Sequence, residues 1–157
     1  MRYRKHIIVA TAIATASLLA VGYSQTGAKC VSVNGLPDSS CTPGATDPRV
    51  TQANIMQTIC VSGYTSTVRP PVSVTAPEKV ASMKQYGYPA GTQGEYDHLI
   101  PLELGGSSDV SNLWFEVGSI PNPKDKVENK LHAEVCSGSK TLQEAQSEIK
   151  TDWRKAN

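Results

Sequence analysis

Residues 95–114 read EYDHLIPLELGGSSDVSNLW, and this stretch decides the fold that we predict. An Asp97-His98 pair opens a β-like run, a Gly-Gly turn follows, and Asn112 leads into the next run. Asp97 could hold a divalent cation while His98 takes a proton from water, and a carboxamide on the partner strand could fix the imidazole. The arrangement suggests metal-assisted hydrolysis of a phosphodiester.

The residues around this stretch predict two strands and then a helix. The first strand is expected over about 96–104, where Pro101 makes it irregular or an edge strand. The second strand is expected over 113–117 and the helix over 124–136. The site begun on the hairpin would then be completed by the helix.

The predicted helix has an apolar side and a polar side. Its apolar residues recur every four positions and predict packing against the domain: Val127, Leu131 and Val135. Asp125, Asn129 and His132 fall within about 60° of one another on a different side, at ~100° per residue. One side would anchor the helix, and the other could present ligands.

Elements of less regular character are expected upstream. Residues 29–47 predict a loop stapled by cysteines, 51–60 a short helix, and 63–76 an extended connector. A capping-box pattern at 75–78 predicts the start of a helix that runs to Gly87.

The C-terminal residues predict a last helix with a clear start. Thr141 and Glu144 form a capping-box pattern. The apolar stripe of this helix comprises Leu142, Ala145, Ile149 and Trp153. We expect the stripe to be buried.

The motif residues together resemble an HNH endonuclease of the ββα-metal type. The resemblance covers about 94–136 and rests on Asp97-His98, Gly105-Gly106, Asn112 and the KDKVENKLH run at 124–132. More weakly, residues 58–64 and 68–71 resemble the region before the motif in small secreted HNH-like proteins. The resemblance implies an α+β fold: a ββα-metal core of hairpin plus helix, flanking helices and a disulfide-stapled N-terminal region.

The resemblance implies a role for each residue of the hairpin. His98 would be the general base, Asp97 a metal ligand, and Asn112 a brace for the hairpin loop that helps to orient the histidine. Adjacent side chains of a regular strand point to opposite faces, so Asp97 and His98 can share a site only if the strand bends. A structural histidine and a surface aspartate are the alternatives.

The helical metal ligand is left open by the sequence. We prefer Asn129, with His132 next and Asn122 as an alternative in the preceding loop. Glu128 could also accept a metal or brace a nearby lysine. Lys124 could neutralise charge in the transition state.

Residues 1–28 have the layout of a secretory signal peptide. Three basic residues precede an apolar run over 7–21, and small residues follow. The run is shorter than the ~20 apolar residues that span a bilayer. We expect a mature chain that begins near Lys29 and is exported, without stable membrane association after the signal is removed.

Export favours disulfides for the four cysteines. Cys30, Cys41, Cys60 and Cys136 have no Cys-x-x-Cys spacing, and an even count in an exported chain indicates two bridges. Three pairings are possible, and the sequence does not choose among them. We favour Cys30 with Cys41 and Cys60 with Cys136, because the second bridge would tie the upstream region to the motif helix; free buried thiols are the alternative.

The charge balance argues less strongly for nucleic acid than the motif does. The chain has 15 basic and 14 acidic residues; without its first 28 residues it has 12 and 14, a net charge of −2. Proteins that hold DNA through phosphates usually carry a basic face. Such a face would have to be local here, formed by Lys124, Lys126, Lys130, Lys150, Arg154 and Lys155.

These observations predict three regions: a signal peptide over 1–28, a cysteine-containing extended region over 29–75 and an HNH-like nuclease domain over 76–157. The expected function is a secreted or extracytoplasmic, metal-dependent endonuclease that acts on DNA, with RNA as a second substrate. Mg²⁺ is the expected ion, with Mn²⁺ and Zn²⁺ as alternatives. The alternative function is a secreted, non-catalytic binding protein on the same scaffold; the oligomeric state stays open.

Overall fold

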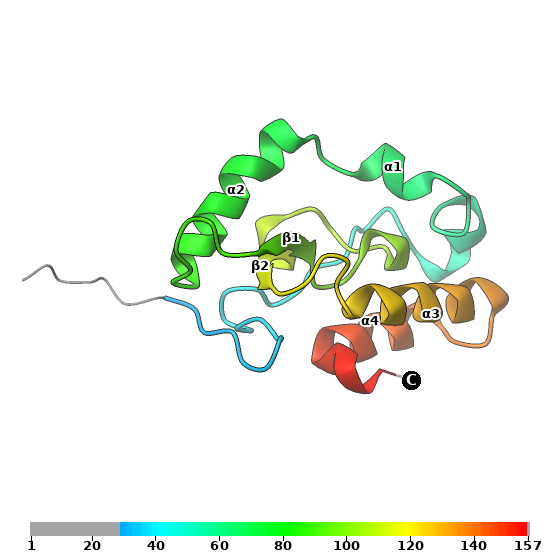
Figure 1. Cartoon of the computed structure of the whole chain (residues 1–157). Helices are drawn as coiled ribbons and strands as arrows, with labels where there is room; N and C mark the ends of the chain where they lie inside the picture. Colours follow the sequence, from blue (N-terminus) through cyan, green and yellow to red (C-terminus); the bar gives the residue numbers. More distant parts are fainter. Residues whose placement is uncertain (1–28, 157) are drawn as a thin grey trace, which may run out of the picture.

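The computed structural model describes residues 29–156, so the predicted signal peptide lies outside the described residues (Figure 1). Its fold is mixed α/β, with 3-10 helices written as η. In chain order the elements are η1 (Gln52–Gln57), α1 (Tyr64–Val68), α2 (Val72–Gln85), β1 (Gly94–His98), η2 (Leu102–Leu104), η3 (Val110–Asn112), β2 (Leu113–Val117), α3 (Lys124–Ser137), α4 (Leu142–Asp152) and η4 (Trp153–Lys155). Within this part of the chain, no helix combines the length and apolar character needed to cross a membrane.

Strands β1 and β2 form a two-stranded antiparallel sheet. Asp97 pairs with Trp114, and His98 with Leu113. Directly paired residues share a face, whereas neighbours along a strand alternate, so the side chains of Asp97 and His98 leave the hairpin on opposite faces. The second strand matches its predicted bounds, but the first ends at His98 instead of running to 104, because the chain bends before Pro101 and then forms η2.

Helices α3 and α4 supply much of the main core and lie side by side in Figure 1. The predicted stripe of α3 is confirmed: Leu131 and Val135 are fully buried, and the partly buried Val127 packs against the same cluster. The helix ends at Gly138 in a left-handed conformation, φ 80°, which a residue with a Cβ adopts only with strain.

The predicted start of α4 is also confirmed. Thr141 Oγ1 accepts from the Glu144 N–H at 3.2 Å, and the Glu144 carboxylate accepts from the Thr141 N–H at 2.9 Å. The predicted stripe lies in or against the main core, with Trp153 only partly buried: Leu142, Ala145, Ile149 and Trp153.

The upstream helices differ from the prediction. The expected connector over 63–76 contains α1 and the start of α2, and α2 begins at Val72, three residues before the predicted capping box. Pro71 is extended at the N-cap, so the chain enters the helix directly after the Pro-Pro pair and Pro77 lies inside it. The boundary expected between 75 and 76 therefore falls within α2, which packs against the hairpin (Figure 1).

Both favoured disulfides are present. Cys30 is bonded to Cys41 within the irregular N-terminal segment, and Cys60 is bonded to Cys136 near the end of α3. The second bridge spans 76 residues and ties the segment after η1 to the motif helix. Two disulfides are typical of proteins in an oxidising, extracytoplasmic environment.

Candidate functional site

His98 ends β1 and is only 6% exposed. Burial lowers the pKa of His98 to about 4; the Asp97 charge opposes this shift, and the charges of Arg69 and Lys124 add to it. The imidazole is therefore neutral at pH 7, which is the form a general base needs.

One imidazole nitrogen of His98 is held in place. Its Nε2 lies 3.1 Å from Ser108 Oγ, a hydroxyl that can donate or accept. Its Nδ1 makes no hydrogen bond within the described part of the chain. When Nε2 carries the proton and donates to Ser108, Nδ1 has a lone pair that can take a proton from water.

Asn112 is fully buried and braces the loop between the strands. Its Oδ1 accepts from the N–H of Ile100 at 3.0 Å and of Ala45 at 3.2 Å. Its Nδ2 donates to the carbonyls of Ile100 at 2.9 Å and Ser107 at 2.8 Å. Asn112 therefore acts on the imidazole indirectly, by fixing the backbone next to Ser108.

Gly106 makes this loop closure possible. A Cβ at position 106 would lie 1.7 Å from the carbonyl oxygen of Ile100 and 3.0 Å from Asn112 Nδ2. Any larger residue would have to displace the backbone that Asn112 holds. The Gly-Gly turn therefore supports the same loop closure as Asn112.

The opposite face of the hairpin holds a fully buried lysine from the first residue of α3. Lys124 Nζ donates to Asp97 Oδ2 at 2.7 Å, to the carbonyl oxygen of His98 at 2.7 Å, and to Glu128 Oε1. Burial by itself would lower the pKa of Lys124, but the carboxylates of Asp97 and Glu128 outweigh it and raise the pKa. Lys124 is thus charged and joins the hairpin to the helix.

Further carboxylates surround this lysine. Glu116 is 2% exposed, and its Oε2 is buried without a hydrogen-bond partner among residues 29–156; burial, with the charge of Asp97, raises its pKa to about 8. Glu95 pairs with Glu116 across the hairpin, and burial raises its pKa as well. Burial raises the pKa of Glu128 to about 7, against the effect of Lys124. The junction between the hairpin and α3 is rich in acidic groups, and burial raises the pKa of Glu95, Glu116 and Glu128.

The structure does not join the preferred helical ligands to Asp97. Asn129 is exposed, and its Nδ2 donates to the backbone carbonyl of Asp125 at 2.6 Å. Asn122 caps the start of α3, where its Oδ1 accepts from the Lys124 N–H at 3.0 Å. The helical side chains that meet the Asp97 junction are Lys124 and Glu128, both of which the sequence offered only as secondary possibilities. Their i, i+4 spacing was the signal that placed them on one side of the helix.

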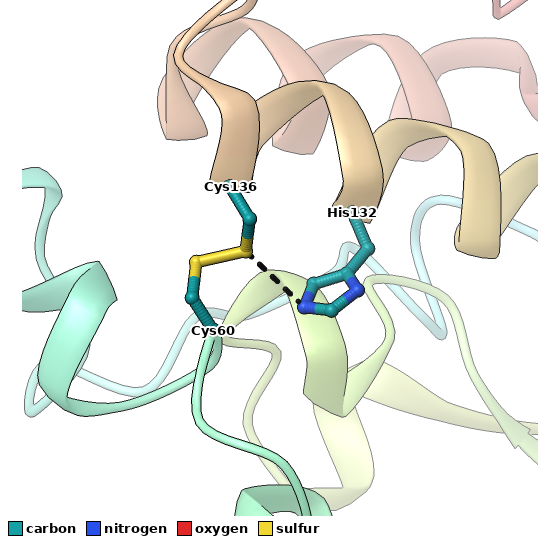
Figure 2. Close-up of side chains that lie close together, drawn as sticks. All are labelled: Cys60, His132 and Cys136. Atoms are coloured by element: carbon teal, nitrogen blue, oxygen red, sulfur yellow. Dashed lines mark hydrogen bonds between the residues drawn. A yellow bond between two sulfur atoms is a disulfide. The ribbon is translucent and has the colours of Figure 1, made fainter.

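His132 lies further along α3 and bonds to the upstream segment. Its Nε2 donates to the carbonyl of Ile59 at 2.9 Å and lies 3.4 Å from Cys136 Sγ (Figure 2). The possible ligand atoms of Cys60, His132 and Cys136 lie within 4.8 Å of one another. Both sulfurs belong to the disulfide, however, and a metal would need them as thiolates. In this form of the protein the cluster is a structural joint.

A surface hollow lies beside the histidine. It has a volume of about 350 Å³, and its wall includes Ser107, the His98 partner Ser108, Arg49, Val68 and Asp109. Arg69 follows Val68, is exposed, and has no side-chain hydrogen bond or ion pair within residues 29–156. Its charge acts on His98, so a cation is available near the hollow.

The HNH resemblance implies a divalent cation, and the contacts at the Lys124 junction show whether one fits there. Oxygens of Asp97, Glu128 and His98 converge on one point, and oxygen is the ligand that hard cations prefer. That point is held by the ammonium group of Lys124. The junction as it stands therefore does not fit a metal ion at this position.

Comparison with known proteins adds no relative: no family model, curated protein or solved structure matches the chain.

Proposed function

We propose that this chain is an HNH-like endonuclease that hydrolyses phosphodiester bonds, with DNA as the first substrate and RNA as the second. The observation that carries the proposal is the state of His98, which is buried, neutral and held through Nε2 by Ser108, a residue that lines a surface hollow. The order of hairpin and then helix supports the resemblance to ββα-metal nucleases.

In this proposal His98 activates the attacking water. Nδ1 accepts the proton as the water oxygen attacks phosphorus in line with the leaving 3′ oxygen, and the P–O3′ bond breaks as that oxygen takes a proton from solvent water. Ser108 holds the other nitrogen, and Asn112 with Gly106 holds the backbone that carries Ser108. The imidazole is then oriented before the substrate arrives, so little ordering is needed during the reaction.

Arg69 is the proposed contact for the scissile phosphate. Guanidinium groups bind phosphate through two parallel hydrogen bonds, and this one has no competing side-chain partner within residues 29–156. The HNH resemblance also implies one divalent cation, Mg²⁺ or alternatively Mn²⁺ or Zn²⁺, which would neutralise charge on the phosphate. Lys124 occupies the position beside Asp97 that was expected for that ion, so the steps above use only residues of the chain.

Export to an oxidising compartment belongs to the same proposal. The signal-peptide pattern of residues 1–28 and the two disulfides support it. A secreted nuclease would meet nucleic acid outside the cell.

A non-catalytic binding protein is the second candidate. The observation that favours it is the excess of carboxylates at the junction around the ammonium of Lys124: Glu95, Asp97, Glu116 and Glu128. Together with the net charge of −2 expected for the mature chain, this acidity disfavours a polyanion. In such a protein, His98 would serve only the packing of the loop.

A cleavage assay separates the two candidates. The chain from Lys29 onward is incubated with supercoiled plasmid, and in parallel with single-stranded RNA, in Mg²⁺, in Mn²⁺ and in EDTA. The nuclease proposal expects nicking that falls by about 10²-fold or more in His98→Gln, the range typical of a lost general base. Gln143→Ala, an exposed change on α4, is the control that should retain full activity. Absence of cleavage by the folded wild-type chain under every condition would rule out the nuclease and favour the non-catalytic binding protein.

A further inference from the structure

We propose that the ammonium group of Lys124 is the resident cation of the junction between the hairpin and α3, and that it takes the place of a divalent metal ion there. The inference concerns cation binding, so it stands whether or not the chain cleaves nucleic acid. Its catalytic consequence, that cleavage does not depend on a divalent metal at this junction, rests on the proposed function.

Three different parts of the chain converge on this one group. A strand side chain, Asp97, and a strand carbonyl, that of His98, meet a helix side chain, Glu128, at Lys124 Nζ. An ammonium group has three N–H donors, and all three are used. The two distances of 2.7 Å are those of charge-assisted hydrogen bonds and exceed the 2.0–2.1 Å of Mg²⁺ to oxygen.

The backbone directs the lysine to this point. Lys124 is the first residue of α3, and its N–H donates to Asn122 Oδ1 at 3.0 Å, while the Asn122 N–H donates to Asp125 Oδ2 at 3.1 Å. These caps fix the first turn of the helix against the hairpin. The side chain of Lys124 is 1% exposed, so its methylenes fill the space between the two elements.

The charge of the lysine is required by its surroundings. A fully buried lysine is rare because desolvation disfavours the ammonium form, unless carboxylates compensate. Asp97 and Glu128 do so here and hold the pKa of Lys124 above its ordinary value. The protein therefore contributes its own cation to a set of oxygens that would otherwise attract one from solution.

The position of Lys124 also limits its role. It is buried on the face of the hairpin opposite the His98 imidazole, so it does not reach a substrate phosphate. It holds the carbonyl of His98 and the carboxylate of Asp97, and it is a positioning residue. The positive charge that a phosphate meets would come from exposed groups such as Arg69.

Two measurements on the wild-type chain test the inference without using activity. In the first, free Mn²⁺ is followed by electron paramagnetic resonance during titration of the chain from Lys29 onward, with Asp97→Asn alongside. In the second, the ¹⁵N signal of the Lys124 ammonium is recorded with and without Mg²⁺. We expect the same weak Mn²⁺ uptake for both chains and an exchange-protected ammonium signal that Mg²⁺ leaves unchanged.

Variants on α3 provide the matched comparison. Lys124→Ala removes the ammonium and leaves its three oxygens, so it should acquire a Mn²⁺ site that Lys126→Ala, an exposed change two residues away, does not. If Lys124→Ala fails to fold, the wild-type measurements still decide. One tight Mn²⁺ site in the wild type that disappears in Asp97→Asn would overturn the inference. Loss of plasmid cleavage in all chains would overturn only the proposed function.

Discussion

The carbonyl oxygen of His98 accepts a hydrogen bond from Lys124 Nζ at 2.7 Å, so the same residue contacts Ser108 with its imidazole and α3 with its backbone. A regular strand sends Asp97 and His98 to opposite faces, and this bond shows how one helix can nevertheless act on both. Lys124 binds the Asp97 carboxylate on its own face and reaches the histidine through the main chain. The position of the imidazole thus depends on a helix that begins 26 residues later.

The pH dependence of cleavage should report on His98. Burial lowers the pKa of this histidine to about 4, and the base form predominates above that value. Cleavage should therefore rise with pH through about 4 and remain level from pH 5.5 to 7.5. The check is a profile of kcat/KM against pH for plasmid nicking. A midpoint near the ordinary histidine value of 6.5 would contradict the buried, neutral state.

Arg69→Gln should weaken substrate binding without affecting the fold. The guanidinium is exposed and has no side-chain partner within residues 29–156, so its loss should change the free energy of unfolding by no more than about 0.5 kcal/mol. Loss of a phosphate contact should raise KM and make cleavage less sensitive to salt. Lys84→Gln, on an exposed lysine of α2 outside the predicted basic face, is the control. Equal KM values for the two variants would remove Arg69 from the substrate site.

Lys124→Met should be strongly destabilising. It leaves the partly buried carboxylates of Asp97 and Glu128 without their cation, and breaking a buried ion pair costs up to about 3–5 kcal/mol. Lys126→Met, on the exposed side of the same helix, should change stability by less than about 0.5 kcal/mol. Urea unfolding measures both. The combination of Lys124→Met with Asp97→Asn should recover part of the loss, because one of the unpaired charges is then removed.

Glu116→Gln should stabilise the protein more at pH 8 than at pH 4.5. In the folded chain the pKa of Glu116 is raised to about 8, whereas its ordinary value is 4.5. Between these values the folded state keeps the proton and the unfolded state loses it, so wild-type stability falls as pH rises through this window. Glutamine removes this contribution.

The measurement is the free energy of unfolding of the wild type and of Glu116→Gln across pH 4.5–8. The contributions of the other titrating groups largely cancel in the difference between the two chains. A constant difference would show that Glu116 ionises normally. Glu148→Gln, on a carboxylate of α4 that is not fully buried, serves as the control for loss of charge alone.

Replacement of Cys60 and Cys136 by serine should cost more stability than replacement of Cys30 and Cys41. The Cys60–Cys136 bridge closes a separation of 76 residues and the Cys30–Cys41 bridge only 11. In the chain-entropy view, their removal lowers the free energy of unfolding by about 4 and 3 kcal/mol, respectively. The Cys60–Cys136 pair also holds the segment whose Ile59 carbonyl binds His132. Thermal unfolding of the two double variants tests the order. The reverse order would mean that the long loop retains its structure without the bridge.

Sequence pattern predicted the elements that depend on local signals. The capping box of Thr141, the apolar stripe of α3 and the strand over 113–117 all follow from spacing and from backbone preferences within a few residues. The predicted start of α2 was wrong because this segment contains two local signals for a helix start. The helix begins directly after the Pro-Pro pair at 70–71, and the capping-box pattern at 75–78 lies inside it.

What the sequence by itself determined is the identity of the chemical groups: a histidine after an aspartate, an asparagine before the second strand, and four cysteines that indicate two disulfides without choosing their pairing. Only the tertiary structure decided which groups meet. Asn129 and His132 had the spacing of ligands, yet the rotation of α3 turned Lys124 and Glu128 toward Asp97 instead. Helical spacing fixes the angles between side chains but not the direction in which the helix faces, and that direction follows from burying Leu131 and Val135 against α4 and the hairpin loop.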